Sequence, residues 1–327
     1  MTPEEYLSGF ASKLNLTDAE IEQISQTHNK LREKLREKLP VVDDFLTGSY
    51  PRNTIIRPKM DDKLDVDFFL AFSNDDFGEY ELPKLLEIVK DALEEIQQND
   101  PDIVGISEQN RSIAVEYDDG YQIDVVPAIE IERDELYKIF DKRTRQPVKS
   151  NPKLHGENLS EANEATEYGS VKRLVPIIKL LKSWKRDKCD YVKSFHLELL
   201  AVEILKDKKI ETFSFGLTKF FTKASNYLQE PSLTDPANNE NMLDAYLDED
   251  GTREALLDLV AQERQMAEKA SQFEFDSDNE NAVKEWKNIF EKDGGERGKH
   301  ANEPKSSGPT IISCPPKQHF NVQIDIE

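Results

Sequence analysis

The feature that most constrains this chain is a pair of acidic residues inside an apolar run. In "KLDVDFFLAF", residues 63–72, Asp65 and Asp67 stand one residue apart among Leu, Val and Phe. Such stretches favour β-strands, and side chains two positions apart on a strand point to the same face. Two ionised carboxylates on one partly buried face repel each other and are costly to desolvate unless a cation lies between them. The pair therefore predicts a strand that binds a divalent metal.

A third carboxylate follows on a predicted hairpin. Residues 112–117 and 121–129 both alternate, and Asp118-Asp119-Gly120 between them is a hairpin signal. Asp124 lies among apolar residues of the second run, so three carboxylates converge if this strand pairs beside the first. That set suits two Mg²⁺ or Mn²⁺ ions in a phosphoryl displacement. The alternative, an acidic pair that ends a strand on the solvent side, stays open.

A Gly-Ser pair precedes the acidic strand. In "LTGSY", Gly48 and Ser49 follow an apolar residue, and Ser49 stands sixteen positions before the first aspartate. A Gly-Ser turn lets backbone N–H groups and a hydroxyl approach a phosphate closely. Many turns contain Gly-Ser, but the combination with a spacer that holds Pro58 and Lys59, and then with the acidic strand, is more specific.

Helical periodicity frames these strands. Thr17 as N-cap and Glu20 in the capping-box position predict a long amphipathic helix over residues 17–38, which we expect to span two lobes. A second helix is predicted over residues 82–97, and residues 168–188 give a third, kinked at Pro176.

The fold class predicted from this order is α+β, with two lobes. We expect a core with a mixed β-sheet over residues 1–155 and a helical C-terminal lobe over residues 156–291. Residues 292–327 are rich in Gly, Pro, Ser and Lys, which predicts a flexible tail. Strict alternation over residues 320–326 predicts a short strand at its end.

Basic residues gather in the helical half. Seven Lys and Arg residues against one Asp occupy residues 172–188, in a chain of net charge −22. Helical spacing puts Lys179, Lys182 and Arg186 on one face, as a triphosphate site requires. The alternative, a solvated basic stripe, stays open for every lysine but Lys182.

Other polar residues have weaker signals. His196 is equally consistent with a substrate contact and with a hydrogen-bonded structural histidine. Arg52 and Arg57 lie near the serine turn and are candidates for phosphate contacts, but surface arginines are common. Glu198 and Glu203 are predicted to be charges on a helix surface.

The bulk composition excludes several classes of protein. The net charge of −22 argues against a constitutive binder of duplex DNA or of an anionic membrane. Cys189 and Cys314 form no Cys/His cluster, so a structural zinc site is not expected. The N-terminus lacks a signal-peptide pattern and no apolar run approaches 18 residues, so we expect a cytoplasmic protein.

Together the motifs resemble a known family. The set "LTGSY", "LDVDFF" and "YQIDVV" is similar to the catalytic signature of polymerase-β-like nucleotidyltransferases. The pair "IIKLLKSWKR" and "SFHLELLAVEIL", with "LTDPANNENML", resembles the cyclic-oligonucleotide synthetases of bacterial anti-phage (CBASS) systems, known as CD-NTases. These are relatives of cyclic GMP-AMP synthase and oligoadenylate synthetase, and the resemblance covers residues 40–245.

The resemblance implies roles for residues of the first half. Gly48 and Ser49 would hold the donor triphosphate. Asp65 and Asp67 would bind two Mg²⁺ (or Mn²⁺) ions, and Asp124 would complete the second ion's ligands and help to activate the acceptor hydroxyl.

It also implies roles in the helical lobe. Lys182 matches a lysine that contacts the donor phosphates, Ser194 matches a phosphate-binding serine, and Phe195 stands where an aromatic ring stacks on the nucleobase.

The activity implied is condensation of ribonucleoside triphosphates into a cyclic di- or trinucleotide, with release of pyrophosphate, for a separate effector protein. Partners implied are regulators from the same operon, of the HORMA or the conjugation type, whereas direct activation by DNA is not expected. Two alternatives remain: a nucleotidyltransferase that modifies a protein, RNA or small molecule, and a degenerate nucleotide-binding scaffold.

Overall fold

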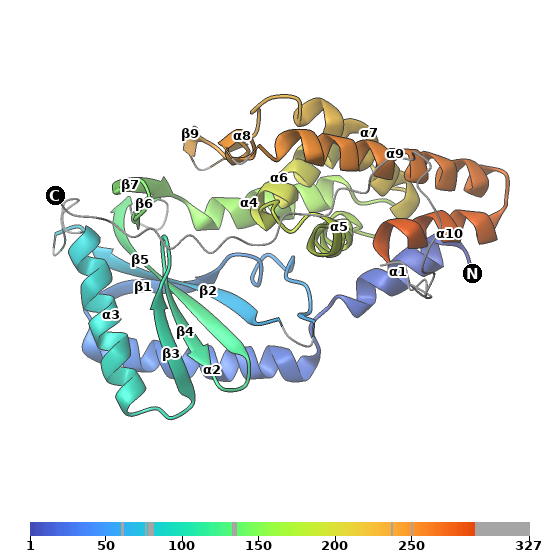
Figure 1. Ribbon diagram of the computed structural model, residues 1–327. Helices are drawn as coiled ribbons and strands as arrows, with labels where there is room; N and C mark the ends of the chain where they lie inside the picture. The colour runs from blue at the N-terminus through green and yellow to red at the C-terminus, as the bar shows by residue number, and fades with distance from the viewer. Residues whose placement is uncertain are drawn as a thin grey trace, which may run out of the picture.

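The computed structural model describes residues 1–59, 62–75, 77, 82–132, 136–236, 238–249 and 251–291. They form two lobes, a sheet with two covering helices and a bundle of helices stacked above it (Figure 1). The α+β class with a mixed sheet is therefore confirmed. The predicted terminal strand at residues 320–326 lies outside the described residues.

One sheet forms the first lobe. Its strands are β1 Val41–Thr47, β2 Leu64–Ser73, β3 Ile103–Glu108, β4 Ile113–Tyr117, β5 Tyr121–Glu132, β6 Leu136–Asp141 and β7 Gln146–Ser150. The order is β1-β2-β5-β4-β3, with β6 paired to β5 and β7 to β6. Strands β2 and β5 run parallel, while all the other pairs are antiparallel. The predicted hairpin is present as β4 and β5, with Gly120 at a φ of 85° in its turn.

Two helices, α2 Asp18–Lys38 and α3 Leu82–Gln98, cover one face of the sheet. The capping box predicted for Thr17 and Glu20 is present at the start of α2. Leu31 and Leu35 of α2 are buried in one cluster with Phe68 and Phe72 of β2, which anchors this helix to the sheet lobe.

The second lobe is helical. Its helices are α1 Pro3–Lys13, α4 Pro152–Ala165, α5 Leu174–Lys188, α6 Ser194–Leu205, α7 Phe213–Tyr227, α8 Tyr246–Glu249, α9 Arg253–Phe275 and α10 Asn279–Phe290. A small hairpin, β8 Thr234–Asp235 with β9 Asn238–Met242, lies beside them. Trp184 and Trp286 are fully buried in the lobe's core.

Two predictions about these helices are wrong. A single long helix does not span the lobes, because α1 packs against α5, α7 and α10 while α2 stays under the sheet (Figure 1). Helix α5 begins at Leu174 rather than at residue 168, after a turn at Tyr168–Val171. Pro176 therefore lies in the first helical turn, where its missing N–H breaks no helical hydrogen bond, and it does not kink the helix.

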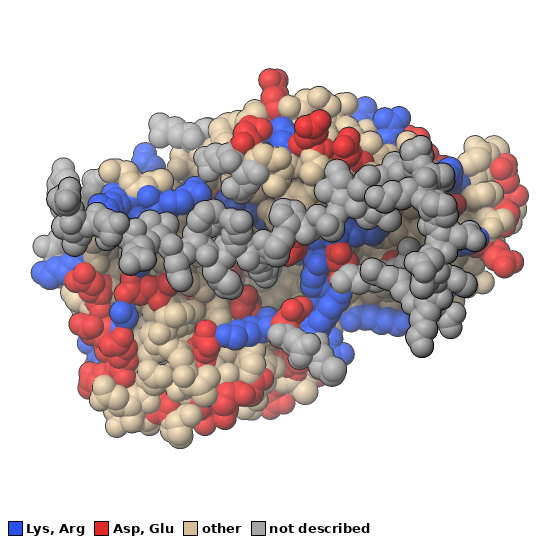
Figure 2. All heavy atoms as spheres, viewed as in Figure 1, with Lys and Arg blue, Asp and Glu red and all other residues tan. Residues whose placement is uncertain are grey.

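The surface reflects this division. Figure 2 shows acidic side chains spread over the visible face of the sheet lobe and basic side chains gathered in the band between the lobes. Within the described residues, no helix has the length and apolar character needed to span a membrane.

Packing of α2 on the sheet is directly testable. Leu31 is 1% exposed, whereas Ile21 of the same helix is 44% exposed. Leu31→Ala is expected to lower the free energy of unfolding by about 2 to 5 kcal/mol, because it leaves a cavity at the sheet. Ile21→Ala is the matched control and is expected to change it by less than about 1 kcal/mol. Equal losses in urea denaturation would contradict this packing.

Candidate active site

Strand register brings the predicted carboxylates together. In the parallel pair of β2 and β5, Asp67 stands opposite Asp124, and Asp65 stands opposite Gln122. Since residues two apart share a face, the three carboxylates lie on one side of the sheet. Thr47 at the end of β1 is opposite Asp67 in turn, so the Gly-Ser turn begins beside these carboxylates.

Glycine is required at the start of that turn. Gly48 has a φ of 73°, and a Cβ atom there would lie 1.7 Å from Oδ2 of Asp67. Any other residue would strain the backbone and displace the carboxylate. The turn is closed by the N–H groups of Thr54 and Ile55, which both donate to the Ser49 carbonyl at 2.9 and 3.0 Å.

The three carboxylates are electrostatically unfavourable as they stand. Asp65 lies at the open rim while Asp67 and Asp124 are half-buried. The pKa of each is raised to about 6, first because each carboxylate is partly removed from water. Proximity adds to the effect, since Asp124 raises the pKa of Asp65, Asp65 that of Asp67, and Asp67 that of Asp124.

This donor set fits a divalent cation. Carboxylate oxygens are the ligands that Mg²⁺ prefers, and a cation would relieve the repulsion that raises these pKa values. Within the residues that the structure describes, no group of three His, Cys, Asp or Glu side chains could hold a metal ion by itself. Mg²⁺ commonly takes one or two protein carboxylates and completes its shell with water and substrate phosphates.

Every site residue predicted from the sequence lines one of two adjoining cavities. A cavity of about 760 Å³ is lined by Gly48, Ser49, Asp67, Asp124, Lys182, Ser194 and Phe195. Asp65 lines the second cavity, of about 610 Å³. Ser49, Lys182 and Ser194 belong to both, so the serine turn and the two helices α5 and α6 stand where the cavities meet.

Lys182 is not part of an open basic face. It is 5% exposed, and its Nζ atom donates to the Thr54 carbonyl at 3.1 Å and to the Thr54 hydroxyl at 3.0 Å. It also pairs with Oε2 of Glu198 at 2.8 Å. Burial lowers the pKa of Lys182, and the Glu198 carboxylate opposes that shift.

The prediction that Glu198 is a surface charge is wrong, because the residue is 2% exposed. Helix α6 is covered on nearly all sides, so its one interior acid needs a cationic partner to be buried. Arg52 is the second such partner, with its Nε atom 2.5 Å from Oε1 of Glu198.

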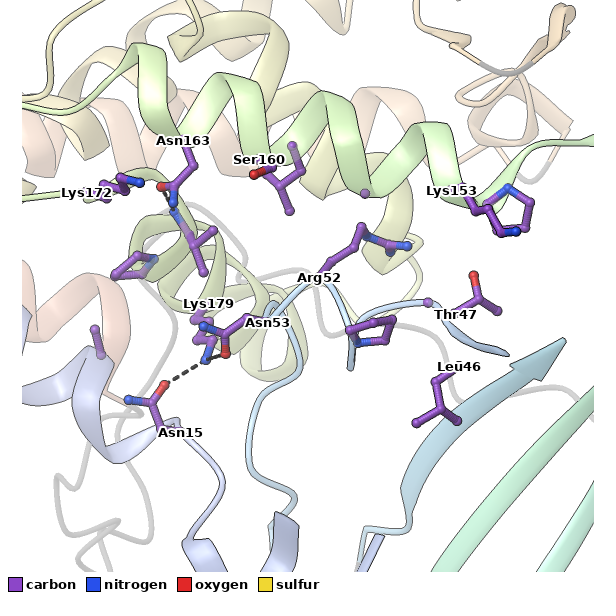
Figure 3. Close-up of a pocket in the computed structure, with 18 of the residues that line it drawn as sticks. Asn15, Leu46, Thr47, Arg52, Asn53, Lys153, Ser160, Asn163, Lys172 and Lys179 are labelled. Atoms are coloured by element: carbon purple, nitrogen blue, oxygen red, sulfur yellow. Dashed lines mark hydrogen bonds between the residues drawn. The ribbon is translucent and has the colours of Figure 1, made fainter. Parts of the chain in front are cut away.

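The basic face predicted on α5 is divided between cavities. Lys179 faces a different cavity of about 610 Å³ behind the Gly-Ser turn, where it donates to Asn15 at 2.7 Å and to Asn53 at 3.0 Å (Figure 3). Arg186 donates to the Arg57 carbonyl at 2.9 Å and lines the cavity that contains Asp65. Of the three, Lys182 alone lines the cavity that contains Asp67 and Asp124.

The structure places two further residues beside Phe195: Arg52, which the sequence offered as a candidate for a phosphate contact, and His155, which it did not single out. The Arg52 guanidinium lies 5.3 Å from the ring centroid of Phe195, and it lowers the pKa of Asp67. The ring of His155, from α4, is 4.9 Å from that of Phe195 and carries a 2.7 Å hydrogen bond to Asp235. Arg52 had a signal, its place three residues after the serine, whereas nothing in the pattern around His155 separates it from a surface histidine.

Two amides hold the third carboxylate. Gln109 and Gln122 donate to Oδ1 of Asp124 at 3.1 and 2.9 Å. These bonds orient the carboxylate, and no bond to its Oδ2 atom is recorded among the described residues.

His196 is a structural histidine. It is 1% exposed, and its Nδ1 atom lies 3.1 Å from the Tyr246 hydroxyl beneath α6. Burial is the main cause that lowers its pKa to about 4.

Together the sheet, the serine turn and the opposed helical lobe have the arrangement of a two-lobed nucleotidyltransferase fold. Residues 1–163 match the family model of the Second Messenger Oligonucleotide or Dinucleotide Synthetase domain, so this part of the chain, which holds the three carboxylates and the serine turn, belongs to that family.

Individual proteins resemble the chain over different lengths. A cyclic AMP-AMP-AMP synthase from Acinetobacter sp. is 29% identical over 214 residues, or 62% of this chain. The chain spans 59% of the length of that relative.

Solved structures share the fold. Escherichia coli CdnC, in a complex with a HORMA protein, is 20% identical with a TM-score of 0.66, covering 88% of this chain and 96% of CdnC. The di-nucleotide cyclase of Vibrio cholerae is 12% identical with a TM-score of 0.71, covering 89% and 96%.

The crowded carboxylates should destabilise the metal-free protein. In EDTA at pH 8, Asp67→Asn is expected to raise the free energy of unfolding by about 1 to 3 kcal/mol, because it removes one of the like charges. Adding Mn²⁺ is expected to raise the melting temperature of the wild type but not that of the variant. Asp118→Asn, on the exposed hairpin, is the control. A lower stability of Asp67→Asn in EDTA would argue against electrostatic strain at this site.

His196 should contribute to acid sensitivity. Because its pKa in the folded protein is lowered to about 4, protonation favours the unfolded chain as the pH falls below about 6.5. The resulting loss of stability, up to about 3 kcal/mol, is complete near pH 4. His196→Gln is expected to have a shallower fall in unfolding free energy between pH 6.5 and 4. Identical slopes for wild type and variant would show that His196 does not titrate in this range.

Proposed function

We propose that this protein condenses ribonucleoside triphosphates into a cyclic di- or trinucleotide messenger and releases pyrophosphate, in bacterial anti-phage defence. The observation that carries the proposal is the meeting of Asp65, Asp67 and Asp124 with the Ser49 turn at the junction of two cavities. Two adjoining cavities suit two nucleotides, a donor and an acceptor. The name of the Acinetobacter relative and the family description support a nucleotide product.

Donor binding is assigned to the turn and the helices. The Gly48–Ser49 backbone and the Ser49 hydroxyl would hold the donor triphosphate, with positive charge from Lys182 and a further hydroxyl from Ser194. Phe195, whose ring is flanked by the Arg52 guanidinium and the His155 ring, would stack on the base.

The reaction joins an acceptor hydroxyl to the donor α-phosphorus. A new O–P bond forms, the bond to pyrophosphate breaks in line, and the hydroxyl proton leaves towards a base. Asp124 is suited to help remove this proton through Oδ2, because its Oδ1 atom already accepts hydrogen bonds from the two glutamines. Mg²⁺ or Mn²⁺ bound by Asp65, Asp67 and Asp124 together with water and the substrate phosphates would neutralise charge on the phosphates.

Ring closure follows from the same geometry. A linear intermediate that re-enters with its free hydroxyl in the acceptor cavity would be cyclised by a second in-line displacement. Regulation by a partner protein from the same operon is part of the proposal, since Escherichia coli CdnC forms a complex with a HORMA protein. The cyclic product would then act on a separate effector.

The decisive experiment incubates the purified protein with all four labelled ribonucleoside triphosphates and Mg²⁺ or Mn²⁺. A product that resists phosphatase, identified by mass spectrometry, is the expected result and names the bases and ring size. Label transferred to protein, RNA or a small molecule would instead identify a different nucleotidyltransferase. The assay is repeated with the products of neighbouring genes, so that an enzyme awaiting an activator is detected.

Asp65→Asn/Asp67→Asn should lower product formation at least about a hundredfold, because it removes the charges that hold the metal and the phosphates. The far-UV circular dichroism spectrum is expected to stay that of the wild type, and Asp118→Asn should retain full activity. Undiminished product from the double variant would refute the assignment of the metal site.

A further inference from the structure

Glu198 joins both cations beside the catalytic cavity. Its Oε1 atom lies 2.5 Å from Nε of Arg52, and its Oε2 atom lies 2.8 Å from Nζ of Lys182. The side chains of all three are at most 8% exposed, so water screens these interactions weakly. Burial alone would raise the pKa of Glu198, but Lys182 and Arg52 outweigh it and keep the group ionised.

The same carboxylate is linked to the serine turn. The Thr54 hydroxyl donates to Oε2 of Glu198 at 2.6 Å, and the Thr54 amide donates to the Ser49 carbonyl at 2.9 Å. Lys182 donates to the carbonyl and the hydroxyl of Thr54 as well. Thr54 therefore bridges the Glu198 carboxylate and the Ser49 carbonyl.

These contacts fix the orientation of the Lys182 and Arg52 side chains as well as neutralising their charges. Lys182 directs its ammonium hydrogens to three acceptors, Thr54 O, Thr54 Oγ1 and Glu198 Oε2, which defines the position of its charge. Arg52 uses Nε for Glu198, and its guanidinium lies over the Phe195 ring. Without the carboxylate, both buried cations would lose their ion pairs, and they would move towards water.

We propose that Glu198 is a positioning residue of this active site, whose carboxylate holds Lys182, Arg52 and the Ser49 turn in the arrangement that receives a nucleoside triphosphate. The inference rests on the proposed function for its effect on turnover, but its effect on nucleotide binding is independent of the product. A purely structural ion pair would stabilise the fold without acting on nucleotide affinity.

The test compares Glu198→Gln, Glu198→Asp and Glu203→Gln. Glu203, on the same helix, has a side chain that is 40% exposed and pairs with Lys206, so its variant is the matched control. Two quantities are measured on protein shown by circular dichroism to be folded: the dissociation constant of ATP by calorimetry in EDTA, and kcat and KM for product formation with Mg²⁺.

Glu198→Gln is expected to weaken ATP binding about tenfold and to lower kcat/KM at least about tenfold, because the cations lose their fixed positions. Glu198→Asp keeps the charge and is expected to recover part of both losses. Glu203→Gln should match the wild type. A lower melting temperature with unchanged ATP affinity and unchanged kcat/KM for Glu198→Gln would overturn the proposal and leave a structural ion pair.

A second variant tests the proposal even if Glu198→Gln does not fold. Thr54→Val keeps the side-chain shape and both ion pairs but removes the hydroxyl that links Glu198 to the turn, so ATP affinity is expected to fall roughly threefold or more. Unchanged affinity in Thr54→Val would overturn the link to the Ser49 turn. If the wild type forms no product under any condition, the proposed function fails, while the ATP measurements still decide the role of Glu198.

Discussion

The parallel pairing of β2 with β5 is the constraint on which the site depends. It sets Asp67 beside Asp124 on one face, and β1 then places the Gly-Ser turn beside the same carboxylates. The arrangement is unfavourable in the absence of a cation, as the raised pKa values of all three aspartates indicate. Backbone hydrogen bonds and the apolar cover of α2 and α3 stabilise a geometry that its own side chains oppose.

Two cations, Lys182 and Arg52, lie beside these carboxylates and are held by a buried partner of their own. The side chains of Lys182 and Arg52 are both buried, and a single carboxylate, that of Glu198, neutralises them there. The cavity thus has Asp67 and Asp124 from the sheet beside Lys182 from α5 and Arg52 from the serine turn, a distribution of charge that suits the proposed binding of a metal-bound triphosphate.

Local patterns predicted much of this, and tertiary burial accounts for what they missed. Alternation around Asp124 and the capping box at Thr17 are local signals, and both correspond to the structure. Glu198 has no such signal, because a helix covered on nearly all sides carries no polar face that marks its one interior acid. Lys179 and Lys182 share a helical face by spacing, but the position of the serine turn, which no spacing reveals, sends them to different cavities.

The residues that line the cavity come from both lobes, and this has a consequence for how the site can change. The carboxylates and the serine turn belong to adjacent strands of one sheet, whereas Phe195 and His155, which line the cavity, stand on helices of the other lobe. Under the proposed function, substitutions at Phe195 or His155 would alter the contact with the base while leaving the three carboxylates in place. Base selection and metal binding would then depend on different lobes, so sequence change in the helical lobe would alter the product while the sheet keeps its carboxylates.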